Sequence, residues 1–151
     1  MKFTPIKINS FLLFKLPAAF FTGVRLQTID EKGATVTVKH RWINQNPFKS
    51  LFWAVQGIAS ELSTGVLVMR EIADSGRKIS MLVTNMNATF TKKATGIATF
   101  VCTDAHLIRE AIQKSIETGD GETVIMKSEG FNADGVSVSQ FEFMWSVKVK
   151  K

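Results

Sequence analysis

The stretch that decides the fold is LFWAVQGIASELSTGVLVM, residues 51–69. Its apolar side chains recur at helical spacing, at Leu51, Val55, Ile58, Leu62, Val66 and Met69, and Phe52, Ala59 and Val68 extend the apolar surface most of the way around. A helix that is apolar on nearly every side is a buried helix, so we expect a long central helix over residues 50–74. Interspersed polar residues such as Gln56 and Glu61 make the stretch a poor membrane span.

Two-residue periodicity, the pattern of half-buried strands, occurs on both sides of this helix. It predicts strands at residues 24–29, 34–42, 79–90, 97–103, 123–131 and 136–150, with a bulge near Asn85 and a second, short helix at 105–117. Short turns at residues 30–33 and 132–135 join neighbouring strands as hairpins. An antiparallel sheet can bury such a central helix only by curling around it. We therefore predict an α+β protein with the hotdog fold: a curved antiparallel sheet of about six strands wrapped around a long central helix.

Length and composition favour one domain over residues 1–151, since 151 residues and 16.8 kDa suit a single core. A hydrophobic fraction of 45% with only three prolines excludes a disordered or collagen-like chain. The single cysteine, Cys102, excludes a disulfide framework and fits a reducing compartment, so a cytoplasmic location is expected. Two histidines and unclustered carboxylates predict no metal site.

The net charge of +6 is spread over nineteen scattered Lys and Arg residues, without an arginine-rich run. This distribution does not favour a nucleic-acid partner, and it suits equally a ligand that carries several phosphates. In the first 22 residues, Lys15 and Pro17 interrupt the apolar stretch at residues 11–21. Residues 1–22 are therefore expected to form an N-terminal helical segment and not a signal peptide or a membrane span.

Glu61 is the only charged residue between Lys49 and Arg70, so no cation on the helix is placed to pair with it. Gly57 and Gly65, one turn away on either side, leave a strip where backbone or ligand could approach closely. A desolvated carboxylate has a raised pKa and can act as a general base. Alternatively, Glu61 is a structural carboxylate, because perturbed acids also occur in structural networks.

The loop at residues 42–50 leads into the helix, and Ser50 or Asn46 is expected to be its N-cap. Capping alone would account for these side chains. In the functional interpretation, free N–H groups at residues 51–53 and the helix dipole polarise a carbonyl group, and Asn46 adds an amide donor.

Asn46 and Glu61, fifteen positions apart, resemble the hotdog thioesterases of the phenylacetate-degradation type, which place Asn in the loop and Asp or Glu at that spacing on the central helix. The strand NMNATF at residues 85–90 and the turn KKATG at 92–96 also resemble this family, and the resemblance runs from about Leu26 to Val149. It implies an acyl-CoA thioesterase in which Glu61 activates water against a thioester carbonyl held by Asn46 and the Trp53 N–H. No cofactor is implied beyond the CoA of the substrate.

These enzymes carry His-Gly-Gly where this chain has Phe52-Trp53-Ala54, and glycine where it has Lys49. The difference leaves a second interpretation open, a non-catalytic protein that binds acyl-CoA or lipid on the same fold.

Further substrate contacts are expected around the helix start. Phe48, Phe52 and Trp53 are expected to line an acyl tunnel, Ser50 and Gly57 to border the substrate, and Lys92 and Lys93 to lie near the CoA phosphates at the pocket mouth.

The functional unit is expected to be a homodimer, and a dimer of dimers is an open alternative. The eight residues from Trp53 to Glu61 separate donor and carboxylate by roughly 12 Å along one helix, too far for one thioester. Two antiparallel central helices would combine Asn46 of one chain with Glu61 of the other, and Gly57 and Gly65 would help the chains approach.

Overall fold

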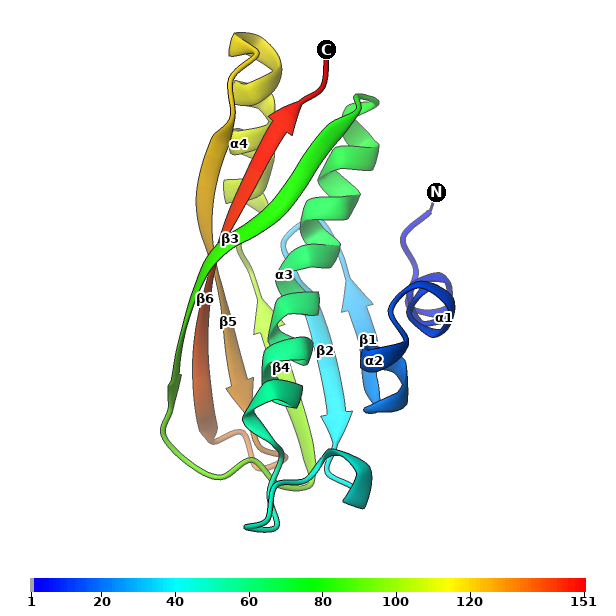
Figure 1. The fold of residues 1–151 in the computed structure, drawn as a ribbon, viewed down its shortest axis with the longest axis vertical. Helices are drawn as coiled ribbons and strands as arrows, with labels where there is room; N and C mark the ends of the chain where they lie inside the picture. The colour runs from blue at the N-terminus through cyan, green and yellow to red at the C-terminus, as the bar shows by residue number, and fades with distance from the viewer. Residues whose placement is uncertain (1) are drawn as a thin grey trace.

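In the computed structural model, which describes residues 2–151, the long helix α3 (Trp53–Ser75) lies in the curve of a six-stranded sheet (Figure 1). The strands are β1 (Val24–Ile29), β2 (Ala34–Lys39), β3 (Ile79–Phe90), β4 (Ile97–Cys102), β5 (Glu122–Phe131) and β6 (Ser137–Val149). Their order is β1-β2-β4-β5-β6-β3, and every neighbouring pair is antiparallel. The predicted hotdog fold is therefore confirmed.

The core lies between α3 and the inner face of the sheet. From the sheet come alternating buried side chains, at Val36, Val38, Ala98, Phe100, Phe141, Phe143, Trp145 and Val147. From α3 come Ala59, Val66, Leu67 and Val68, which are fully buried. The indole N–H of Trp145 donates a 2.9 Å hydrogen bond to the Thr64 hydroxyl, so the polar atoms at this contact are paired. The expected bulge is present as a register shift between Val83 and Asn85.

The central helix begins three residues later than predicted, at Trp53, and ends at Ser75. Leu51 and Phe52 are extended, because the Leu51 N–H donates to the Ala94 carbonyl and the Phe52 N–H donates to the Asn44 carbonyl, both at 2.9 Å. The N-cap is Phe52, which makes no side-chain capping bond. The prediction that Ser50 or Asn46 caps the helix was therefore wrong.

Strand β2 is also shorter than predicted and ends at Lys39. The chain turns there into a 3₁₀ turn, η1 (Trp42–Asn44), which leaves Trp42 exposed although its alternation with Val36 and Val38 predicted burial. Buried Asn44 holds this turn, since its amide donates to the carbonyls of Thr22 and Lys39 and its oxygen accepts from the Arg41 N–H.

Three further helices pack against parts of the sheet and α3. The predicted segment at residues 1–22 forms two helices, α1 (Pro5–Lys15) and α2 (Pro17–Phe21), beside β1, and Met1 lies outside the described residues. Helix α4 (Ala105–Thr118) packs against α3, where Glu71 forms ion pairs with Arg109 at 3.0 Å and Arg70 at 3.1 Å. No helix within residues 2–151 is both long and apolar enough to cross a membrane. The opposite, N-terminal end of α3 remains open, and Trp53 there is 57% exposed.

Candidate active site

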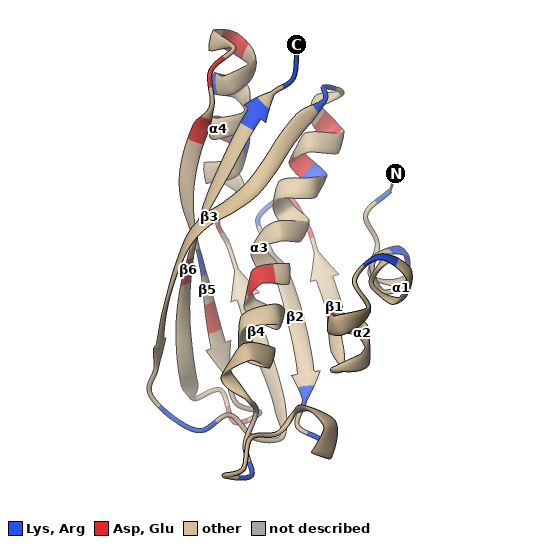
Figure 2. Ribbon diagram, in the orientation of Figure 1, with Lys and Arg blue, Asp and Glu red and all other residues tan. Residues whose placement is uncertain are grey.

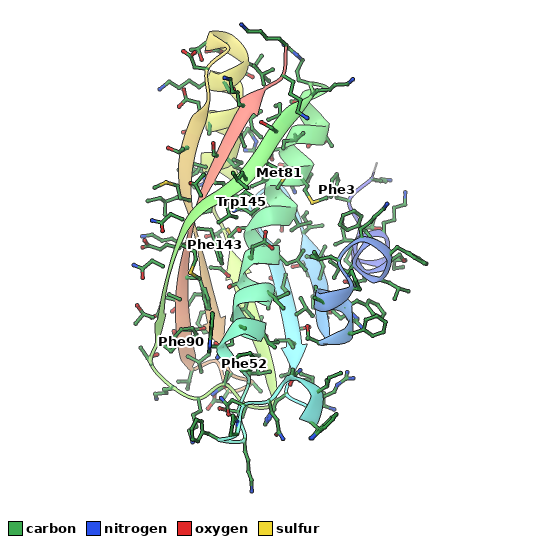
Figure 3. The ribbon with its side chains drawn as sticks, viewed as in Figure 1. Phe3, Phe52, Met81, Phe90, Phe143 and Trp145 are labelled. Carbon is green, nitrogen blue, oxygen red and sulfur yellow. The ribbon has the colours of Figure 1, made fainter. Side chains whose placement is uncertain are left out.

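The N-terminus of α3 opens on a groove of about 520 Å³ between the loop before the helix and the connection from β3 to β4. Its lining includes every predicted site residue except Gly57 and Glu61, together with Pro47, Leu51, Gln56, Phe90, Thr91 and Ala94. Phe52 and Phe90 lie at the same end of the molecule (Figure 3). The structure therefore brings Lys92 and Lys93 to the groove that contains the helix start.

Asn46 shapes the loop that carries this groove. Its amide nitrogen donates to the Ser50 hydroxyl at 2.9 Å and to the Leu51 carbonyl at 3.3 Å. Its oxygen accepts from the backbone N–H groups of Phe48 and Ser50. The side chain thus has partners within the loop, and its direct contact with a substrate carbonyl stays a prediction.

Lys49 in the same loop has a φ of 62°, the left-handed conformation that favours glycine. This is the position where the resembling enzymes carry glycine. The loop conformation is therefore the one glycine would adopt, with the lysine side chain projecting from it.

Two backbone donors at the start of α3 have no acceptor among residues 2–151, the N–H groups of Trp53 and Ala54. The next two, of Val55 and Gln56, both donate to the Phe52 carbonyl. Of the predicted free donors at residues 51–53, only that of Trp53 is free, because the first two pair with Ala94 and Asn44. Unpaired N–H groups at the positive end of a 23-residue helix suit a carbonyl oxygen that gains negative charge.

Glu61 and Gly57 line a second, mainly apolar pocket of about 360 Å³, which also includes Trp53. Its other walls come from α2, α3, β3 and β6, with Leu16, Ala18, Ala19, Ala54, Ile58, Met86 and Phe143. Trp53 is thus the residue shared by the groove and the apolar pocket. A Cβ atom on Gly57 would meet only the Phe141 ring, at 4.0 Å, so the apolar pocket has room for a ligand group beside this position.

The Glu61 carboxylate is the single acidic position in the middle of α3 (Figure 2). It forms neither an ion pair nor a side-chain hydrogen bond with the described residues. Burial raises its pKa from 4.5 to about 6, because desolvation penalises the charged form. An unpaired carboxylate with a pKa close to neutrality can accept a proton from water.

Gly65 makes room for this carboxylate. A Cβ atom at Gly65 would lie 3.1 Å from a Glu61 carboxylate oxygen and 3.2 Å from the Trp145 ring. Because Gly65 is buried beneath these two side chains of its own chain, it is not available to a partner chain. The expectation that Gly65 helps two chains approach was therefore wrong.

Sequence reasoning missed Gln56 as a groove residue. Its side chain is only 4% exposed, yet its amide oxygen has no hydrogen-bond donor among residues 2–151. The available signal was an amide side chain within a helix predicted to be buried, one turn after Trp53.

Other chemistry-bearing residues do not form a site. Burial raises the pKa of the Cys102 thiol to about 12, which disfavours the reactive thiolate. Within residues 2–151, no three His, Cys, Asp or Glu side chains gather closely enough to hold a metal ion.

The comparisons with known proteins agree with the fold. Residues 8–147 match the model of DUF4442, a domain of unknown function. A protein of unknown function from Pseudomonas aeruginosa, described as a probable thioesterase, superposes with a TM-score of 0.82 at 19% identity, covering 97% of both chains. A thioesterase from Haemophilus influenzae superposes with a TM-score of 0.72 at 13% identity, covering 99% of this chain and 93% of its own. No curated protein matches the chain.

The raised pKa of Glu61 predicts how its removal changes stability. The folded state holds the carboxyl proton more tightly than the unfolded chain, so the stability from this group is present below about pH 4.5 and is lost as pH rises through about 6. Glu61→Gln removes the charge, so the free energy of unfolding of this variant should be about 2 kcal/mol higher than that of the unchanged protein at pH 8. At pH 4 the two free energies of unfolding should be nearly equal.

Urea denaturation at both pH values measures this difference. Glu110→Gln, on the exposed face of α4, removes the same charge from a solvated position and serves as the control. A Glu61→Gln variant less stable than the unchanged protein at pH 8 would contradict a desolvated, unpaired carboxylate.

Proposed function

The chain belongs to the DUF4442 family of domains of unknown function, and we propose that it hydrolyses acyl-CoA thioesters with a water molecule activated by Glu61. The observation that carries this proposal is the Glu61 carboxylate, which is unpaired and has its pKa raised to about 6. It lies in an apolar pocket, and Trp53 lines both this pocket and the groove at the start of α3. The thioesterase descriptions of structures with the same fold support the reaction class. The reaction needs no cofactor beyond the CoA of the substrate.

In the proposed reaction, the thioester carbonyl oxygen accepts a hydrogen bond from the Trp53 N–H at the positive end of α3. Glu61 takes a proton from a water molecule, and the water oxygen attacks the carbonyl carbon. The tetrahedral oxyanion then collapses, the C–S bond breaks, and the proton held by Glu61 passes to the departing thiolate. The products are a carboxylic acid and free CoA, and the carboxylate is regenerated. Asn46 acts on this step by holding the loop in front of the donor.

Donor and carboxylate come from different chains of a homodimer in this proposal. Within one chain, the helix rise separates the Trp53 and Glu61 α-carbons by roughly 12 Å along the axis, whereas a general base must lie within about 3 Å of its water. The sheet ends at β3, whose outer edge is unpaired, and Leu82 and Met86 along it are exposed. A second copy beside β3 could bring its own Glu61 towards the apolar pocket that Trp53 lines.

A non-catalytic acyl-CoA or lipid-binding protein is the second candidate. The observation in its favour is the bulk at the helix start, where Phe52 and Trp53 are 43% and 57% exposed and border the groove. Such rings offer apolar contact area to a bound acyl or lipid chain, and they leave little room for a reacting carbonyl group.

Release of free CoA from a panel of acyl-CoA thioesters distinguishes the two candidates. Hydrolysis should follow the charged form of Glu61, so kcat/KM should rise with pH and level off above an inflection near 6. Glu61→Gln should lower kcat by at least about a hundredfold, the typical contribution of a general base. Glu110→Gln should leave kcat unchanged. Tight binding of acyl-CoA without turnover at any chain length would contradict the enzyme and support the binding protein.

Lys92 and Lys93 line the groove and are proposed to contact the phosphates of CoA. Replacing both with alanine should raise KM for acyl-CoA about 5- to 30-fold, since charge-assisted phosphate contacts contribute about 1 to 2 kcal/mol. KM for the same acyl group on N-acetylcysteamine, which has no phosphate, should not change. The double replacement of Lys150 and Lys151 removes two exposed charges at the far end of the molecule and is the control (Figure 1). Equal effects on both substrates would contradict the phosphate contact.

A further inference from the structure

We propose that helices α1 and α2 dock on an anionic lipid surface, with exposed apolar side chains entering the headgroup region and lysines contacting the lipid phosphates. This inference goes beyond the proposed function, because it holds whether or not the chain hydrolyses a thioester. The surface, called the α1–α2 face below, consists of Ile6, Phe14 and Phe21 with Lys2, Lys7 and Lys15.

Helix α1 is held with one side against the body of the protein. Ile8 and Leu12, four residues apart, are buried in the core. The amide of Asn9 donates to the Leu26 carbonyl of β1 at 3.1 Å, and its oxygen accepts from the Leu26 N–H at 2.8 Å. These contacts fix which side of α1 faces outward.

The outward side of α1 is apolar as well. Ile6, Ser10 and Phe14 follow at four-residue spacing and therefore lie on one side of the helix. Ile6 is 81% exposed and Phe14 is 78% exposed. On the neighbouring helix α2, Phe21 is exposed too (Figure 1). A helix that is apolar on opposite sides is typical of one that is covered on both, so the outer side of α1 indicates a partner.

The charges around these apolar side chains are positive. Lys2, Lys7 and Lys15 are exposed, and none of them forms an ion pair within residues 2–151. Residues 2–29 contain no Asp or Glu, and Figure 2 shows no acidic position on α1 or α2. Exposed apolar side chains flanked by lysines are the pattern of a helix that lies on an anionic membrane surface.

A second copy of the chain would fit the α1–α2 face poorly. A symmetric interface sets the same patch of both chains together, so the lysines of one chain would gather beside those of the other. The face has no acidic side chain to pair with them. Anionic lipids supply this negative charge, and their hydrocarbon region accepts the apolar side chains. Charge complementarity therefore favours a lipid surface over a second copy.

Helix α2 also connects this face to the apolar pocket. Leu16, which precedes α2, and Ala18 and Ala19 within it line one wall of the pocket that contains Glu61. Docking through α1 and α2 therefore brings this pocket close to the lipid surface.

Flotation of the full-length protein with lipid vesicles tests the proposal. Vesicles of phosphatidylcholine with about 30% phosphatidylglycerol are compared with vesicles of phosphatidylcholine alone, at about 0.1 M salt. The unchanged protein should bind the anionic vesicles at least about 10-fold more strongly than the neutral ones. Added salt should weaken this binding, because it screens the lysines.

Two double variants separate the apolar and the charged parts of the face. Ile6→Ser with Phe14→Ser should lower the affinity for anionic vesicles at least about 10-fold, because the side chains that enter the lipid are lost. Lys7→Gln with Lys15→Gln should lower it by at least about 10-fold and leave the affinity for neutral vesicles unchanged. Both variants should melt at nearly the same temperature as the unchanged protein, since the replaced side chains are exposed.

Matched controls change the exposed face of the sheet instead. Ile125→Ser removes an exposed apolar side chain from β5. Lys127→Gln with Lys148→Gln removes two exposed charges from β5 and β6. Both controls should bind the anionic vesicles as the unchanged protein does.

Absence of binding to anionic vesicles, equal binding to both kinds of vesicle, or an equal loss of binding in the controls would overturn the proposal. Light scattering gives a further check. If Ile6→Ser with Phe14→Ser has a lower molecular mass in solution than the unchanged protein, a second copy covers the face and the proposal is wrong. No thioester is present in these measurements, so their outcome is separate from that of the hydrolysis experiment.

Discussion

The structure depends on one constraint, that the apolar surface of α3 must be covered on nearly every side. Ala59, Val66 and Val68 are fully buried, and a flat sheet could not reach all of their positions. The six strands therefore curl around α3, and α4 and the N-terminal helices cover what the sheet leaves open. Coverage ends at the first turns of α3, which is where the groove and the apolar pocket lie.

Several polar groups on this part of α3 have no partner among residues 2–151. They are the Glu61 carboxylate, the N–H groups of Trp53 and Ala54, and the amide of Gln56. Elsewhere on α3, buried polar groups are paired, as Thr64 is with Trp145 and Glu71 with Arg109. Unpaired polar groups oppose folding, so their concentration beside two cavities is typical of a site that a ligand completes.

The strands could be predicted from the sequence because their burial alternates with the two-residue period of a strand. Even the bulge near Asn85 was visible, as a change of phase in the apolar residues. The start of α3 could not be predicted, because it depends on the hydrogen bonds from Leu51 to Ala94 and from Phe52 to Asn44. Both bonds join residues that are separated in the sequence, and the pattern of apolar residues gives no sign of them. The predicted burial of Trp42 was wrong for a related reason. The buried side chain of Asn44 holds a turn that begins before the alternating pattern of the strand ends.

At the candidate site, Glu61 has no other charged residue near it on the helix, and this correctly predicted that it lacks an ion-pair partner. Its desolvation depended on the walls from α2, β3 and β6, which no local pattern specifies. The role of Asn46 in the loop and the orphaned amide of Gln56 likewise depend on which donors and acceptors the folded chain brings near them. Residue type therefore indicated which side chains could belong to a site. Only the tertiary structure showed which of them have hydrogen-bond partners and which do not.

The central claim is that two chains complete each site, and mixing two inactive variants tests it most directly. Chains with Asn46→Ala, which disrupts the donor loop, are co-refolded with an equal amount of Glu61→Gln chains, and heterodimer formation is verified by mass spectrometry. Half of the dimers are then mixed, and each mixed dimer has one site with both lesions and one intact site. A site shared between two chains predicts that about a quarter of the unmutated activity returns. Heterodimers that remain as inactive as either parent would contradict a site shared between chains.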